Sequence, residues 1–240
     1  MRVIINSQEQ SNELVAMEYV KLLKDKPASV LGLATGSTPL GLYSKLIEHY
    51  KNGAVSFKDV KTFNLDEYIG LSSEHEQSYR YFMNKNLFEH IDIDLKNTNV
   101  PSGLGADEKA CEDYERSLIE AGEMDIQLLG LGTNGHIGFN EPLTPFDSVT
   151  RIVKLADATR EANKRFFSSI DEVPTHAITM GISSIMRAKK IILMVFGAAK
   201  AEVVKQVVMG KPTIAVPGSL LQLHNNLDIY LDFEAASRLG

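Results

Sequence analysis

The stretch Gly130–Pro142 reads GLGTNGHIGFNEP and directly follows a short apolar run, Ile126–Leu131. An apolar run bounded by glycine is typical of a buried strand. In open α/β sheets, ligands bind just beyond the carboxyl ends of such strands. His136 and Glu141 are therefore candidates for acid–base chemistry at a strand tip, although a histidine beside a tight turn is often only structural.

The length and composition of the chain favour a single domain, residues 1–240, because no linker or charge block divides it. The formal net charge of −6 comes from interspersed acids and bases, which argues against a nucleic-acid surface but leaves room for a local basic pocket. The chain turns polar too early for a signal peptide, and its longest apolar stretch, Ile191–Ala199, is far shorter than the ~20 residues of a membrane-spanning helix. We therefore expect a cytoplasmic protein with neither a membrane nor a nucleic-acid partner. The sequence does not decide between a monomer and a homo-oligomer.

Short apolar runs alternate with amphipathic segments along the chain. Strands are expected at Val3–Asn6, Val30–Ala34, Val60–Asn64, Ile126–Leu131, Arg151–Leu155, Ala177–Gly181, Ile191–Phe196 and Leu227–Leu231. Helices are expected at Ser7–Lys26, Pro39–Tyr50, Tyr79–His90 and Ala106–Ala121, from Asp157 or Thr159 to Phe167, and from just after Lys200 to Met209. This alternation predicts one three-layer α/β domain with a mainly parallel, Rossmann-like sheet and helices on both faces.

A candidate anion site follows the second strand, where the residues are Thr35, Gly36, Ser37, Thr38 and Pro39. Thr38 is a suitable N-cap and Pro39 suits the first position of a helix. Free backbone amides, the positive end of the helix dipole and three hydroxyl groups would then converge on one point. This is more than a helix cap requires, so we expect the loop to hold an anionic group.

Charged side chains follow two further strands. Asp66 and Glu67 come after the strand Val60–Asn64, and since neighbouring side chains of an extended chain point opposite ways, only one of them should face a given cleft. The spacing does not say which. Lys200 follows the strand Ile191–Phe196 and could reach a phosphate as a point charge. Polar clusters at four strand ends indicate an enzyme.

Several chemistries lack their usual pattern in this chain. We find no metal-ligand spacing, no G-x-G-x-x-G that opens a helix with an acidic residue beyond it, and no G-x-S-x-G elbow, so neither a metal nor a cofactor is expected. The remaining interpretation is cofactor-free proton transfer on a small phosphorylated substrate.

Four segments, LGLATGSTP, FNLDEY, GLGTNGHIGFNEP and TREANKRFF, together resemble the glucosamine-6-phosphate deaminase (isomerase) family. The resemblance covers nearly the whole chain. It implies conversion of glucosamine 6-phosphate and water to fructose 6-phosphate and ammonia, with Asp66 as the base that moves a proton between C2 and C1. His136, supported by Glu141, would open the sugar ring. The phosphate would lie on the loop from Thr35 to Thr38, clamped by Arg165 and Lys200, with a lid segment at about residues 145–170.

Two departures from the family pattern bear on mechanism and control. Many members carry an aspartate where this chain has Asn134, which can orient His136 by hydrogen bonding but cannot add a charge. We therefore expect Glu141 alone to be the anionic partner of His136. Regulated members, which are longer, carry a lysine and a threonine where this chain has Val153 and Lys154. We expect kinetics without allosteric control.

Two rival functions remain. A 6-phosphogluconolactonase is similar in its glycine–histidine loop but has no use for a base on the FNLDEY segment. A non-catalytic sugar-phosphate sensor would need the phosphate site but neither Asp66 nor His136. Such sensors usually carry a DNA-binding module, and no helix-turn-helix segment or basic face is evident in this sequence.

Overall fold

The computed structural model describes residues 1–161 and 163–240. In this part of the chain, seven strands form one sheet in the order β1-β10-β9-β6-β2-β3-β5, and every neighbouring pair is parallel. The strands are β1 (Arg2–Ile5), β2 (Val30–Leu33), β3 (Lys61–Asn64), β5 (Thr98–Asn99), β6 (Ile126–Leu129), β9 (Ile191–Val195) and β10 (Leu227–Leu231). The predicted α/β architecture with a mainly parallel sheet is confirmed.

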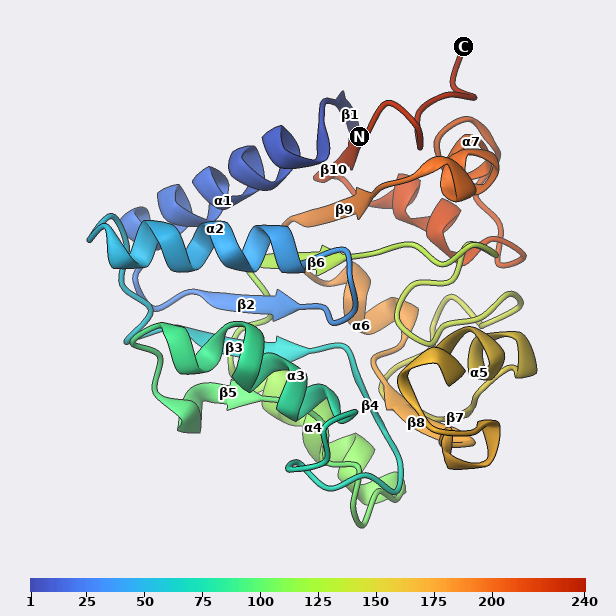
Figure 1. The fold of residues 1–240 in the computed structure, drawn as a ribbon, viewed down its shortest axis with the longest axis horizontal. Helices are drawn as coiled ribbons and strands as arrows, with labels where there is room; N and C mark the ends of the chain where they lie inside the picture. The colour runs from blue at the N-terminus through green and yellow to red at the C-terminus, as the bar shows by residue number, and fades with distance from the viewer.

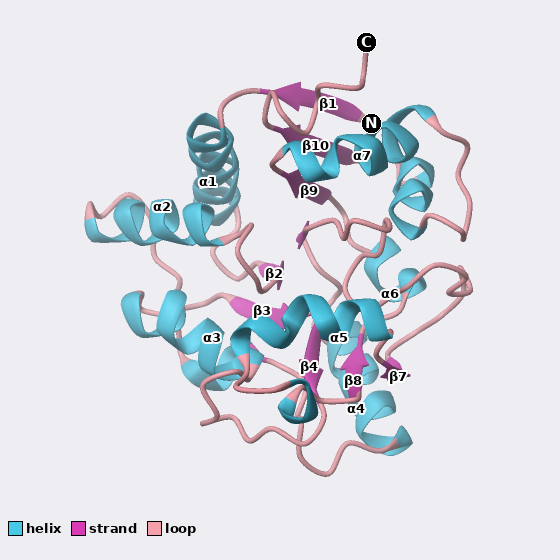
Figure 2. Cartoon of the chain, turned by 45° about the vertical axis from the view of Figure 1, so that its right-hand side comes forward, coloured by secondary structure: helices cyan, strands magenta, loops and turns pink.

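Helices cover both faces of this sheet, with α1, α2 and α3 on one side and α4, α6 and α7 on the other (Figure 2). Their bounds are α1 (Gln8–Asp25), α2 (Leu40–Lys51), α3 (Tyr79–Asn86), α4 (Glu108–Glu120), α5 (Asp157–Asn163), α6 (Ile182–Met186) and α7 (Ala201–Met209). Because the sheet is covered on both faces, every residue of the central strands β2, β6 and β9 is buried.

Local sequence explains where several helices begin. Ser7 and Gln10 form a reciprocal capping box at α1, and the Asp107 side chain accepts from the amide of Ala110 at α4. The predicted cap of α2 is wrong: the helix begins at Leu40, Pro39 occupies the cap position in a helical conformation, and no side chain caps it. Since the cap lies one residue later than expected, the Thr38 hydroxyl is not used for capping.

The segment Tyr79–His90 is not one helix as predicted. The α3 helix ends at Asn86 because Leu87, with φ −145° and ψ −60°, leaves the helical conformation, and a 3₁₀ turn follows at Phe88–His90. The predicted helix toward Phe167 likewise divides into α5 and a 3₁₀ turn, Lys164–Phe166. Both are boundary differences. The short helix α6 and the 3₁₀ segment Pro217–Leu223 were not predicted.

The order of strands reverses between β2 and β6. From β2 the chain continues outward to β3 and β5, whereas from β6 it continues the other way to β9 and β10. The arrowheads of β2, β3, β6 and β9 all point toward the side of the molecule where α5 lies (Figure 1). A crevice outside the carboxyl ends of strands at such a reversal is where open α/β sheets bind ligands.

A second, antiparallel sheet lies at this same edge, which the sequence did not predict. It contains β4 (Asp66–Tyr68), β8 (His176–Thr179) and β7 (Arg151–Lys154), in the order β4-β8-β7. The expectation that β7 and β8 alternate with helices in the parallel sheet is therefore wrong, and the segment after β3 is a strand rather than a loop. Only Leu65 separates β3 from β4, and its carbonyl accepts from the amide of Met180 at 2.7 Å, which turns the chain into the new sheet.

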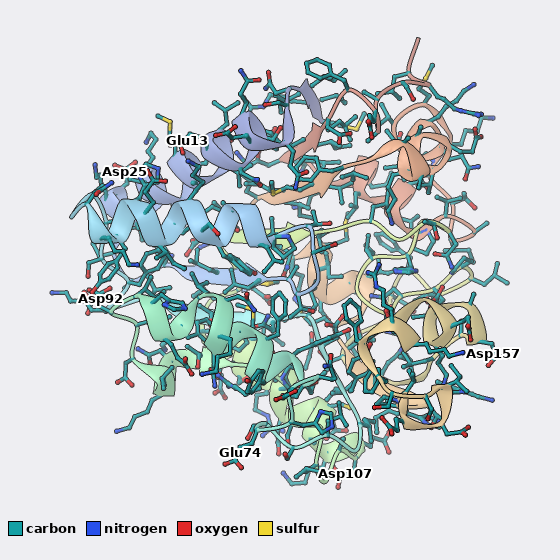
Figure 3. All side chains as sticks on the ribbon, viewed as in Figure 1. Glu13, Asp25, Glu74, Asp92, Asp107 and Asp157 are labelled. Atoms are coloured by element: carbon teal, nitrogen blue, oxygen red, sulfur yellow. The ribbon has the colours of Figure 1, made fainter. Side chains whose placement is uncertain are left out.

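Charge is spread over the surface. Six acidic residues labelled in Figure 3 lie around the periphery: Glu13 and Asp25 on α1, Asp157 on α5, and Glu74, Asp92 and Asp107 in loops. Among the described residues, no helix is long and apolar enough to cross a membrane.

Candidate active site

Four loops that follow four adjacent strands meet at the reversal of the sheet. These loops follow β3, β2, β6 and β9. One hydrogen bond and two distances show how close the loops lie to one another. Lys200 Nζ, after β9, donates to the carbonyl of Leu131 at 2.7 Å. A β-carbon placed on Gly130 would lie 3.9 Å from Thr38 Oγ1, and one placed on Gly138 would lie 3.4 Å from Asp66 Oδ2. The residues predicted from separate strand ends therefore share one neighbourhood.

Asp66 is the first residue of β4 and is nearly enclosed, with 7 % of its surface exposed. Burial, with a smaller contribution from the charge of Glu67, raises the pKa of its carboxyl to about 8. No other described residue donates a hydrogen bond to this carboxylate within the structure. A carboxylate without donors, with a pKa near neutrality, is suited to accept a proton from a bound molecule.

Glu67, the alternative that spacing left open, points the other way and is fully engaged by the backbone. Its Oε1 accepts from the amides of Tyr68 at 2.8 Å and Tyr79 at 2.9 Å, and its Oε2 accepts from the amide of Arg80 at 2.9 Å. The Tyr79 and Arg80 amides open helix α3, so the carboxylate also lies at the positive end of that helix. Glu67 thus joins β4 to α3.

His136 lies in a turn that glycine makes possible. A β-carbon on Gly132 would overlap the imidazole ring, so only glycine allows the ring to lie against the backbone there. Gly135, with φ +87°, adopts a conformation that other residues avoid. His136 Nδ1 lies 3.6 Å from Glu141 Oε2, within reach for an ion pair although longer than a hydrogen bond.

Two neutral donors hold the Glu141 carboxylate. Thr159 Oγ1 donates to Oε1 at 2.5 Å, and Asn134 Nδ2 donates to Oε2 at 2.6 Å. The Asn134 Oδ1 also accepts from the backbone amide of His136 at 3.2 Å, so Asn134 bridges the two residues. Burial alone would raise the pKa of Glu141. The neighbouring His136 and the two hydrogen bonds outweigh burial and hold the pKa at about 2.

The loop from Thr35 to Thr38 lies between β2 and the start of α2. Gly36 is exposed and has φ +92°, which turns the chain between the strand and the helix. Across residues 1–161 and 163–240, no side chain or backbone group pairs with the hydroxyls of Thr35, Ser37 or Thr38. The first amides of α2 also have no side-chain cap. The loop therefore offers free donors at the positive end of a helix, as anion sites do.

Two cations, Lys200 and Arg165, lie near each other at this edge of the sheet. Lys200 is half-buried, and burial together with the charge of Arg165 lowers its pKa. Neither Lys200 nor Arg165 forms an ion pair with a carboxylate of the described chain. Arg165 is exposed and lies over the ring of Phe166, 4.6 Å from its centroid. Two neighbouring cations without a counter-charge favour binding of an anion.

Three residues at this edge were missed by sequence reasoning. Arg151 NH1 donates to Asn140 Oδ1 at 3.0 Å, and burial lowers the pKa of the guanidinium. Asn140 is fully buried and donates to the carbonyls of Ile137 and Met180. Thr159 contacts Glu141 as described. Asn140 and Thr159 lie inside FNEP and TREANKRFF, which was their only signal in the sequence, whereas Arg151 lies outside both segments.

A metal site does not emerge from the described part of the chain, where no three His, Cys, Asp or Glu residues cluster at ligand distance. The arrangement instead offers a buried carboxylate of high pKa, a histidine with an ionised partner, and an anion cradle. Such groups can move protons on a small molecule that the cradle holds by its charge.

Comparison with known proteins assigns the chain to a class: it belongs to the family described as glucosamine-6-phosphate isomerases/6-phosphogluconolactonase, which it matches over residues 6–229. Within that class its relatives include the glucosamine-6-phosphate deaminase of Thermoanaerobacter sp. (strain X514), 52% identical over 99% of this chain and 94% of the relative. Another is the glucosamine-6-phosphate deaminase of Clostridium botulinum (strain Langeland), 50% identical over 100% of this chain and 99% of the relative.

Solved structures agree with this assignment. A monomeric glucosamine-6-phosphate deaminase superimposes with a TM-score of 0.96 at 44% identity, covering 99% of this chain and 100% of that one. The 6-phosphogluconolactonase of Trypanosoma brucei has a TM-score of 0.78 at 18% identity, covering 100% of this chain and 98% of that one. The second likeness shows a shared fold and nothing about the reaction.

Proposed function

We propose that this protein is a glucosamine-6-phosphate deaminase, which converts glucosamine 6-phosphate and water to fructose 6-phosphate and ammonia. The observation that carries the proposal is the meeting of Asp66 with the His136–Glu141 pair beside an anion cradle. Near Gly138, the Asp66 carboxylate lies against the loop that presents His136. Whole-chain relatives with this activity at about 50% identity support the choice of substrate.

In the proposed mechanism, the ring opens first. His136 transfers a proton from the O1 hydroxyl to the ring oxygen, and the nearby Glu141 carboxylate stabilises the imidazolium during this transfer. Asn134 is a positioning residue, because it connects the His136 backbone to Glu141. Opening exposes an aldehyde at C1, which makes the C2 proton acidic enough to be removed.

Asp66 then acts as the base. It takes the proton from C2 and returns it to C1, while O1 gains a proton and the amino nitrogen loses one, which leaves a hydroxyl at C1 and a ketimine at C2. Water adds to that carbon, the carbon–nitrogen bond breaks, and ammonia leaves. A carboxyl with a pKa of about 8 can both accept and return a proton near neutral pH.

The phosphate of the substrate would bind to Thr35, Gly36, Ser37 and Thr38, with Lys200 and Arg165 completing the site. Free hydroxyls, uncapped helix amides and two unpaired cations support this placement. Arg165 follows α5 within the segment 145–170, and we propose that this segment closes over the bound sugar. A cytoplasmic, monomeric enzyme without allosteric control fits the likeness to a monomeric deaminase.

The test compares two substrates. Purified protein should release ammonia from glucosamine 6-phosphate with a hyperbolic rate curve, and it should hydrolyse 6-phosphogluconolactone no faster than buffer does. If the protein hydrolysed the lactone but released no ammonia, it would be a 6-phosphogluconolactonase and the proposal would be wrong. Binding of the phosphosugar without turnover of either compound would favour the sensor.

A further inference from the structure

Two side chains on one face of α5 reach two different parts of the reaction centre. Thr159 and Asn163 are four residues apart, so they lie one above the other on the helix. Thr159 Oγ1 donates to Glu141 Oε1 at 2.5 Å, and Asn163 Nδ2 donates to the hydroxyl of Tyr68 at 2.7 Å. Figure 2 shows α5 crossing in front of β4 and β8.

The contact of Thr159 is enclosed. This residue is 8 % exposed, and its hydroxyl is one of two neutral donors to a carboxylate that must stay ionised and turned toward His136. A hydrogen bond to an ionised group is stronger than one between neutral groups. The position of α5 therefore bears directly on where the Glu141 carboxylate lies.

The contact of Asn163 leads to Asp66. Tyr68 follows Asp66 by two residues on β4, so both side chains lie on the same face of that strand. The Tyr68 ring packs 5.8 Å from the ring of Phe139, which belongs to the loop of His136. Tyr68 is 3 % exposed, and its hydroxyl accepts a hydrogen bond from Asn163 in this enclosed position.

The same helix leads into the phosphate site. Arg165 comes two residues after Asn163, in the 3₁₀ turn that continues α5, and its positive charge helps to lower the pKa of Lys200. On the other side, Arg160 NH2 donates to the carbonyls of Ile170 and Val173 at 2.9 and 3.1 Å, which joins α5 to the segment that follows it. An anion held by Arg165 would thus act on a helix that is hydrogen-bonded to Glu141 and to Tyr68, which shares a strand with Asp66.

We infer that Thr159 and Asn163 are positioning residues through which α5 couples occupation of the phosphate site to the orientation of Glu141 and of the strand that carries Asp66. The inference rests on the proposed function for its role in turnover, whereas the coupling itself is a structural property. It explains why an uncharged threonine and an asparagine, which need not touch the substrate, occupy this face of the helix.

The experiment measures hydrogen–deuterium exchange with and without inorganic phosphate as the probe. In the wild-type protein, phosphate should slow exchange in α5, in residues 134–141 and in the segment around Tyr68. In Thr159→Val, which removes the hydroxyl at nearly constant shape, phosphate should still protect α5 but no longer residues 134–141. Thr159→Ser keeps the hydroxyl and should behave as the wild type. Thr175→Val is the matched control, because its exposed hydroxyl contacts His176 rather than Glu141.

The second variant tests the other contact. In Asn163→Leu, phosphate should no longer protect the segment around Tyr68, while residues 134–141 keep their protection through Thr159. Phosphate protection of residues 134–141 that survives in Thr159→Val would overturn the inference. So would a wild-type protein in which phosphate protects α5 alone or nothing at all.

Turnover gives an independent reading. Loss of a hydrogen bond to an ionised group predicts that kcat for ammonia release falls on the order of 10-fold to 100-fold in Thr159→Val, with a much smaller change in KM. Thr159→Ser should stay within about 3-fold of the wild type. A wild-type protein that shows the exchange pattern but releases no ammonia would refute the proposed function and leave the coupling standing. A fall in kcat without the exchange pattern would refute the coupling alone.

Discussion

Asp66 and Glu141 are the two carboxylates of the proposed site, and their surroundings shift their pKa values in opposite directions. Asp66 begins a short strand, receives no hydrogen bond from the described chain, and has its pKa raised by burial to about 8. Glu141 lies in a loop, accepts from Thr159 and Asn134, and has its pKa held at about 2. Two acids with pKa values moved apart by their surroundings can take different roles at the same pH.

The comparison teaches that hydrogen-bond donors and a neighbouring charge, rather than burial alone, set the pKa difference between Asp66 and Glu141. Both are partly or wholly enclosed, and enclosure by itself favours the protonated form. Only Glu141 has neighbours that stabilise its charge. Glu67 differs from both: three backbone amides bind its carboxylate and leave no capacity for a substrate, yet burial outweighs them and raises its pKa.

The largest effect is expected for Asp66→Asn. The amide cannot accept a proton from C2, so both C2 proton exchange and ammonia release should fall by about 1,000-fold or more, with binding of the phosphosugar retained. Exchange into C2 is followed by NMR in deuterated water, and ammonia by a coupled assay. Exchange that persists in the variant would place the base elsewhere.

The pH profile should follow the ionisation of Asp66. Because its pKa is raised to about 8, the ionised fraction of the free protein falls about 10-fold for each pH unit below that value. We therefore expect kcat/KM to rise with pH and level off near pH 8. Initial rates measured from pH 6 to 9 check this, and a flat profile over that range would contradict a role for Asp66 as the base.

A smaller effect is expected for Asn134→Asp, which tests the surroundings of Glu141. The new carboxylate would stand where an amide now donates at 2.6 Å, so it removes a donor and adds a like charge. We expect kcat/KM to fall roughly 3- to 30-fold and the acidic limb of the pH profile to move to higher pH. A several-fold rise in rate with an unmoved profile would show that Asn134 is not a positioning residue.

The smallest effect on catalysis is expected for Glu67→Gln, the matched control for Asp66→Asn. An amide in this place presents a donor to backbone donors, so the free energy of unfolding should drop by about 1–3 kcal/mol while C2 exchange continues in the folded protein. Urea unfolding measures the first quantity. If Glu67→Gln kept its stability but lost C2 proton exchange, Glu67 rather than Asp66 would be the base.

Much of the parallel sheet could be predicted because most of its strands lie in mainly apolar runs, whereas the polar strand β5 was not predicted. A strand such as β9, buried on both faces, carries that requirement in its own residues. The segments of β7 and β8 were predicted as strands, but β4 was missed, and the separate antiparallel sheet that these three strands form was not predicted. These strands are short, and their pairing depends on partners far along the chain, as with Asp66 and Arg151, which both oppose Thr179. The cap of α2 was missed because a one-residue shift is below what local preference can resolve.

The residues of the proposed site also divide into features that the local sequence predicts and features that depend on distant partners. By itself, the sequence determined that polar groups follow buried strands, that glycines permit the turn around His136, and that no disulfide could form from the lone Cys111. Only the tertiary structure decided that Glu67 binds backbone amides, that Thr159 reaches Glu141 across 18 residues, and that Lys200 reaches the Leu131 carbonyl across 69. The physical reason is that apolar periodicity is written locally, whereas desolvation and hydrogen bonding depend on which distant groups the folded chain brings within a few ångströms.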